Sequence, residues 1–82
     1  MSNDRLTVEQ CRGARAMLGW SQTQLAEASN VSRQTIADFE RGAHKPIGNN
    51  LASIITAFTA AGIDFIPENG GGAGVRLKKP AT

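Results

Sequence analysis

The residues with the clearest chemical potential lie on one side of a short segment near the middle of the chain. If this segment is helical, the spacing i, i+1, i+4, i+5 and i+8 turns one set of side chains outward, opposite Ile36 and Phe39. The outward set is Arg33, Gln34, Ala37, Asp38 and Arg41. Small, hydrogen-bonding and cationic side chains at the start of a helix suit base edges in a DNA major groove, where Arg pairs with guanine and Gln with adenine. The plainer interpretation, a solvated helix face, is the better one for an isolated helix.

A second helix is predicted just before this segment. Ser21 followed by Gln24 forms a capping box, and Asn30 tolerates the left-handed conformation that a tight turn needs. Ser32 then caps a helix over residues 33–41, which Gly42 ends. Two short capped helices joined by a turn of about three residues have the geometry of a helix-turn-helix. This context favours base recognition over the plainer interpretation.

Two further helices flank this pair. A capping box of Thr7 and Gln10 opens the first, Gly19 ends it, and its inward positions are Val8, Cys11, Ala14 and Leu18. Asn49 or Asn50 is predicted to cap the last helix, whose apolar stripe is Leu51, Ile54, Ile55 and Phe58 and which Gly62 ends. Trp20 is expected to brace the junction between the first two helices.

The end of the chain predicts a β-hairpin. Pairing Ile63 with Leu77 and Phe65 with Val75 places four apolar side chains on one face, and it sets Asp64 opposite Arg76 on the other. This register leaves residues 69–71 as a three-residue loop, with Gly71 in the left-handed conformation. A lone two-stranded hairpin is barely stable in water. The apolar face must therefore pack on the last helix, on the same element of a second copy of the chain, or on both, and we expect both.

Composition limits the class of protein. The chain has 82 residues and a net charge of +2, which permits an anionic partner without proving one. One cysteine and one histidine exclude a disulfide framework and the usual zinc ligand sets, so we expect no metal and no cofactor. The longest apolar run, residues 51–63, is too short to span a bilayer, and the first ten residues contain no apolar stretch. We expect a cytoplasmic protein with no membrane association and no small-molecule ligand. Because no nucleophile–base set can be assembled from its residues, we also expect no enzymatic activity.

Residues 21–42, SQTQLAEASNVSRQTIADFERG, resemble the helix-turn-helix of the lambda-repressor and Cro family. The matching positions are Ser21, Gln22, Leu25, Ala26, Val31, Ser32, Ile36, Glu40 and Gly42. With the flanking helices the resemblance covers roughly residues 7–61. It implies a mainly α fold: a lambda-repressor-like domain of about four helices, here followed by the short hairpin. The expected organisation is a tail over residues 1–6, a DNA-binding domain over 7–61, and a hairpin with a basic end over 62–82.

The resemblance also implies roles for individual residues. Its groove-facing, base-contacting positions correspond to Ser32, Arg33, Gln34 and Asp38. Its phosphate-contacting positions correspond to Ser21, Gln22, Arg41 and Lys45. Arg15 and Glu40 match a pair that forms a structural salt bridge in the family. Asp38 departs from the pattern, because an acid would face a polyanion: it either accepts from a cytosine amino group or holds Gln34 one turn earlier.

The function that the resemblance implies is sequence-specific binding to double-stranded DNA by a transcriptional regulator. We expect a repressor that binds a palindromic operator as a homodimer, with dimer contacts from Ile63, Phe65, Val75 and Leu77. One alternative with the same fold is an antitoxin or mobile-element control protein that represses its own operon. Another alternative is a protein-interaction module that kept the fold, but such a module has no need of donors at Gln22, Arg33 and Gln34.

Overall fold

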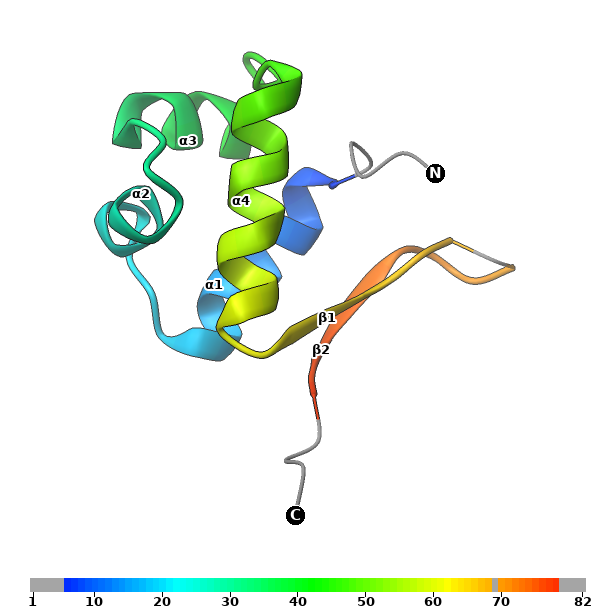
Figure 1. Ribbon diagram of the computed structural model, residues 1–82. Coiled ribbons are helices and arrows are strands. Elements are labelled where there is room, and N and C mark those ends of the chain that lie inside the picture. The colour runs from blue at the N-terminus through cyan, green and yellow to red at the C-terminus, as the bar shows by residue number, and fades with distance from the viewer. Residues whose placement is uncertain (1–5, 69, 79–82) are drawn as a thin grey trace.

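The computed structural model describes residues 6–68 and 70–78. Within these ranges, four helices are followed by an antiparallel pair of strands. The elements are α1 (Val8–Leu18), α2 (Gln22–Ser29), α3 (Arg33–Glu40), α4 (Gly48–Ala60), β1 (Ile63–Ile66) and β2 (Gly74–Leu77). In Figure 1, α2 and α3 lie on one side of α4, and the hairpin leaves the end of α4 on the other side. No helix of the described residues is long and apolar enough to cross a membrane.

The starts of α1 and α2 are set by the two predicted capping boxes. The Thr7 hydroxyl accepts from the Gln10 backbone N–H at 2.9 Å, and the Gln10 side chain accepts from the Thr7 N–H at 3.0 Å. Ser21 and Gln24 make the same reciprocal pair at 3.0 and 2.7 Å. Gly19, at φ 67°, ends α1 in the left-handed conformation. These local signals fix where α1 ends and α2 begins.

The turn between α2 and α3 also follows the prediction. Asn30 adopts φ 58°, and the buried Val31 follows it. The Ser32 hydroxyl then accepts from the Thr35 N–H at 3.0 Å and caps α3. Helix α3 ends at Glu40, one residue earlier than predicted, because Arg41 has left helical geometry at φ −93° and ψ 6°.

The prediction for the start of α4 was wrong. Neither Asn49 nor Asn50 is the cap: the helix begins at Gly48, and the capping position is Ile47, which makes no side-chain hydrogen bond. The buried Pro46 anchors the loop just before this point, and the Ile47 carbonyl accepts the first helical hydrogen bond from the Leu51 N–H at 2.9 Å. Both asparagines consequently fall inside the first turn.

The helices enclose a single apolar core. Its largest fully buried side chains are Leu25, Ile36, Leu51, Ile54, Phe58 and Ile63. Trp20 stacks on Phe58 with ring centroids 5.8 Å apart, so it ties the α1–α2 junction to α4. The core therefore holds α2 on α4, and it holds α3 against α2 and α1.

The hairpin has the predicted register. Ile63 pairs with Leu77, Phe65 with Val75, and Asp64 with Arg76, whose Nε lies 2.9 Å from the Asp64 Oδ2. The prediction of a three-residue loop was wrong, because pairing ends at Ile66–Gly74 and leaves residues 67–73 between the strands. Pro67 has no N–H to donate, so the ladder is interrupted there.

The glycine with positive φ in this loop is Gly70, at 100°, and not Gly71 as predicted. Asn69, the first residue of the predicted loop, lies outside the described residues.

Contacts from the helices hold the hairpin in place. On the β1 side, Ile63 is fully buried, and Phe65 meets Phe58 edge to face with centroids 6.0 Å apart. On the β2 side, the Gln10 side chain donates to the Gly74 carbonyl at 3.0 Å. Val75 approaches so close to α1 that a Cβ on Gly13 would lie 3.3 Å from its Cγ2. The hairpin therefore packs on α1 as well as on α4.

Candidate nucleic-acid interface

The starts of α2 and α3 lie next to each other. Ser32, Arg33 and Gln34 are all exposed at the beginning of α3, and Ser21 is exposed at the beginning of α2. The Arg33 guanidinium reaches the Gln22 side-chain oxygen at 3.5 Å, which joins the two helices at this point. A helix start carries unpaired backbone N–H groups and the positive end of the helix dipole, so two adjacent starts favour anions.

Asp38 continues this face one turn further along α3. Its Oδ1 accepts from the Gln34 Nε2 at 2.9 Å and from an Arg41 guanidinium nitrogen at 3.0 Å. The hydrogen bond from Gln34, together with the contact from Arg41, holds the pKa of Asp38 below its usual value. Of the two roles considered for Asp38, the hydrogen bond to Gln34 is present. The bond to Arg41 joins it at the adjacent turn.

Glu40 lies beneath this face and connects it to α1. The structure places Arg15 and Glu40 in a two-pronged ion pair, with nitrogen–oxygen distances of 2.7 and 2.8 Å. The Gln22 amide donates to the same carboxylate at 3.1 Å, and so does the Cys11 thiol at 3.1 Å. The resemblance implies that Gln22 contacts phosphate and steadies the start of the helix that reads DNA; in the structure it also ties α2 to the end of α3. No local pattern signals this bond, because the two residues are 18 positions apart.

These contacts determine the ionisation of the buried groups. Burial by itself raises the pKa of Glu40, but the hydrogen bonds from Arg15, Gln22 and Cys11 outweigh it and keep the pKa below its usual value. Burial, with the adjacent Glu40 carboxylate, raises the pKa of the Cys11 thiol far above its usual value. Cys11 is consequently a protonated, buried thiol that donates to Glu40, and it lacks the features of a reactive cysteine.

Cationic side chains continue the face beyond α3. Arg41 and Lys45 are both exposed. The loop between them is fixed at its start, because the Asp38 backbone carbonyl accepts from the N–H groups of Ala43 at 2.8 Å and His44 at 3.4 Å. A shallow depression lies between the outer side of α3 and this loop. Its lining residues are Thr35, Asp38, His44, Lys45, Pro46, Ile47 and Asn50.

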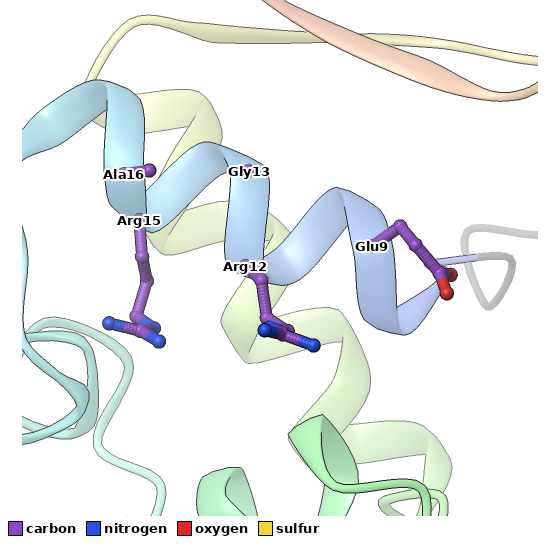
Figure 2. Close-up of a pocket in the computed structure, with 5 residues that line it drawn as sticks. All are labelled: Glu9, Arg12, Gly13, Arg15 and Ala16. Carbon is purple, nitrogen blue, oxygen red and sulfur yellow. The ribbon is translucent and has the colours of Figure 1, made fainter.

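A second basic feature lies on α1. An open groove runs along this one helix. Its lining residues are Glu9, Arg12, Gly13, Arg15 and Ala16. Figure 2 shows the Arg12 and Arg15 side chains pointing the same way, with Glu9 turned toward the start of the helix. Arg15 is committed to Glu40, whereas Arg12 is exposed. Arg12 therefore provides an exposed cation on a different helix from the α2–α3 face.

The four hairpin residues expected at a dimer contact differ in exposure. Ile63 is fully buried inside its own chain, and Phe65 and Val75 are partly buried against the same core. Leu77 remains 55% exposed, and Met17 on the neighbouring α1 is 44% exposed. The apolar face of the hairpin is thus covered along β1 and open at the end of β2.

Comparison with known proteins identifies the helical part. A helix-turn-helix family model matches residues 12–59, which is more than half of the chain. The chain belongs to the lambda-repressor-like helix-turn-helix family. This helix-turn-helix protein therefore carries the DNA-binding domain of a family of regulators, and the match includes α2, α3 and the Arg15–Glu40 pair. No curated protein matches the sequence. Among the described residues, no three His, Cys, Asp or Glu side chains form a cluster that could hold a metal ion.

Proposed function

We propose that this helix-turn-helix protein is a sequence-specific transcriptional regulator that binds a two-fold symmetric operator as a homodimer and acts as a repressor. The observation that carries the proposal is the adjacent starts of α2 and α3, where Arg33 and Gln34 are exposed and Arg33 reaches the Gln22 side chain. Hydrogen-bonding side chains at the start of an exposed helix can reach base edges, while the adjacent helix start receives a phosphate.

Within this proposal, the α3 side chains have distinct tasks. Arg33 pairs with guanine through its fork of donors, and Gln34 pairs with adenine through its amide. Ser32 caps α3: its exposed hydroxyl accepts from the Thr35 N–H at 3.0 Å and donates to the Thr35 hydroxyl at 2.7 Å. It contacts DNA by exchanging the bond to the Thr35 hydroxyl for one to a base or the backbone.

Phosphate contacts flank the base contacts on both sides. At the start of α2, the backbone N–H of Gln22 and the hydroxyl of Ser21 are the donors assigned to one phosphate, because the Ser21 N–H is already bound by Gln24. Arg41 and Lys45 are exposed at the far end of α3 and in the loop, where they can neutralise further phosphates. This arrangement sets the register of α3 in the groove without reading sequence.

The homodimer follows from how such domains read DNA. Two α3 helices in successive major grooves are about 34–36 Å apart and need a subunit contact that holds this spacing. Leu77 on β2 and Met17 on α1 are exposed apolar side chains. In Figure 1, β2 lies on the side of the molecule away from α2 and α3. We assign the contact to this surface, with Ile63, Phe65 and Val75 supporting it from within each chain. Repression then needs only occupancy of the operator, and it takes place in the cytoplasm on chromosomal DNA.

Selection of bound duplexes from random DNA tests the function. The expected result is one inverted repeat with half-sites one helical turn apart, bound about 1000-fold or more tightly than a scrambled duplex at the same salt concentration. Affinity for both duplexes should fall steeply with salt. Equal, weak binding to all sequences would contradict the proposal, and it is the result expected of a protein-interaction module that kept the fold.

A further inference from the structure

Asp38 is the one acidic side chain among the outward residues of α3, and it already accepts hydrogen bonds from two neighbouring side chains. Its side chain is only 23% exposed, and one carboxylate oxygen accepts from Gln34 on one turn and from Arg41 on the next. A polyanion would repel a free carboxylate at this position. The Arg41 guanidinium offsets the charge of the carboxylate. Together with the bond from the Gln34 amide, this makes Asp38 a link between a base-facing residue and a phosphate-facing residue.

The chemistry of the Gln34–Asp38 bond determines how the Gln34 amide is turned. An ionised carboxylate can only accept, so the group of Gln34 that faces Asp38 must be its NH₂ and not its oxygen. The lowered pKa of Asp38 keeps the carboxylate ionised at neutral pH. The Oε1 of Gln34 is therefore directed away from Asp38, together with the second N–H of the amide.

This orientation matters because an amide can read adenine in only one way. The oxygen must accept from the adenine N6 amino group, while the nitrogen donates to N7. With one N–H held by Asp38, Gln34 still has the oxygen and one N–H for these two bonds. Without Asp38, the amide can rotate by half a turn and exchange its donor and acceptor sides.

We propose that Asp38 is a specificity-determining positioning residue, which fixes the Gln34 amide in the orientation that pairs with adenine and contacts no base itself. The inference rests on the proposed function, because it needs α3 to lie in a major groove. It replaces the alternative in which the carboxylate accepts from a cytosine amino group. The second hydrogen bond of Asp38, which it accepts from Arg41, holds the Arg41 guanidinium at the end of α3.

A double-mutant comparison tests this role. Duplexes would be selected from random DNA with the wild-type chain, Gln34→Ala, Asp38→Ala and the double variant, and affinities would then be measured on single-base variants of the selected site. Gln34→Ala identifies the base pair that Gln34 reads, with an expected loss of adenine preference of about 5- to 100-fold. Asp38→Ala should reduce preference at the same base pair by about 5-fold or more, and in the Gln34→Ala background it should have no further effect there.

Two additional variants make the result specific. Asp38→Asn keeps the size of the side chain but offers both a donor and an acceptor, so the Gln34 amide can bind in either orientation and adenine preference should be intermediate. Glu27→Ala removes the same charge from an exposed position on α2. Both Asp38→Ala and Glu27→Ala should raise affinity for a scrambled duplex, but only Asp38→Ala should change the preference for adenine.

The outcomes separate the inference from the proposed function. Loss of preference for cytosine at a different base pair in Asp38→Ala, additive with Gln34→Ala, would overturn the inference, because Asp38 would then be a direct reader. An unchanged preference in Asp38→Ala, or in Gln34→Ala, would overturn it as well, while specific binding by the wild-type chain would leave the proposed function standing. A wild-type chain without any preferred duplex would refute the proposed function itself.

Discussion

Among single residues, Glu40 makes the contacts that hold α1, α2 and the end of α3 together beneath the interface. Its side chain is 5% exposed and accepts from Arg15, Gln22 and Cys11. Glu40→Ala leaves those donors without their partner, so we expect a loss of about 3 kcal/mol in the free energy of unfolding, measured by urea denaturation. Asp64→Ala, which breaks the exposed pair with Arg76, is the control and should cost less than about 1 kcal/mol. Equal losses in the two variants would contradict this view of Glu40.

The lowered pKa of Glu40 also gives a pH dependence with a definite sign. Because the folded-state pKa lies below the unfolded value near 4.5, the stabilisation from ionised Glu40 is fully present above pH 4.5 and is lost as the pH falls through the folded-state pKa. The difference in stability between wild type and Glu40→Gln should therefore be constant near neutral pH and shrink in acid. A difference that grows as the pH falls would mean that Glu40 is protonated in the folded protein.

Arg33 and Gln34 are the residues to which base recognition is assigned. Replacing either with Ala should lower preference at one base pair by about 1–3 kcal/mol and leave the melting temperature unchanged, since both side chains are exposed. Arg12→Ala removes an exposed cation from α1 and serves as the control for Arg33→Ala. If sequence preference is unchanged in both α3 variants, α3 does not lie in the major groove.

Among the elements, α4 begins without a side-chain hydrogen bond at its capping position. Its capping residue Ile47 has the extended backbone of a cap at φ −64° and ψ 160°, but its side chain is apolar and 70% exposed. Ile47→Ser should supply the missing acceptor and stabilise the protein by about 1 kcal/mol, or about 4–8 °C in melting temperature. Asn49→Ala, two residues into the helix, should not destabilise the protein. A loss of about 1 kcal/mol in Asn49→Ala would show that Asn49 is the cap and that the helix starts later in solution.

The phosphate contacts assigned to the end of α3 and the loop after it should contribute equally to the affinity for every DNA sequence. Neutralising Arg41 or Lys45 should weaken binding to selected and scrambled duplexes to the same extent. It should also reduce the salt slope by about one for each phosphate that is no longer neutralised, or by about two in a symmetric dimer. Affinity titrations over a range of salt concentrations measure both quantities. A weakening confined to the selected duplex would mean that these residues read bases.

The elements were predictable where their causes are local. The capping residues Thr7, Ser21 and Ser32 and the turn at Asn30 each act within three or four residues, and the alternation around Asp64 determined the register of the hairpin. Contacts that join distant parts of the chain were not predictable in this way. The bonds from Gln22 to Glu40 and from Gln10 to Gly74 depend on how the helices pack, which no short pattern encodes. Gly13 did offer a signal, because a glycine inside a helix often marks a close approach such as that of Val75.

At the scale of the whole molecule, the proposal depends on a second copy of the chain. Leu77→Lys places a charge on the exposed end of β2, where the side chain contributes little to the core of its own chain. We expect the variant to stay folded, with a melting temperature lowered only by the loss of dimer stabilisation, to sediment as a monomer, and to lose most of its affinity for the inverted repeat. Lys78→Ala alters the next exposed position and is the control. A Leu77→Lys chain that stays dimeric and binds as tightly as wild type would place the subunit contact elsewhere.

An NMR titration of the ¹⁵N-labelled protein with its selected duplex maps the DNA contact residue by residue. We expect the largest amide shifts at the starts of α2 and α3, from Ser21 to Gln22 and from Ser32 to Gln34, with smaller shifts at Arg41 and Lys45. The exposed side of α1 around Arg12 should show little change. Largest shifts on α1 or at the hairpin loop, with α3 unaffected, would contradict the assignment of α3 as the helix that reads DNA.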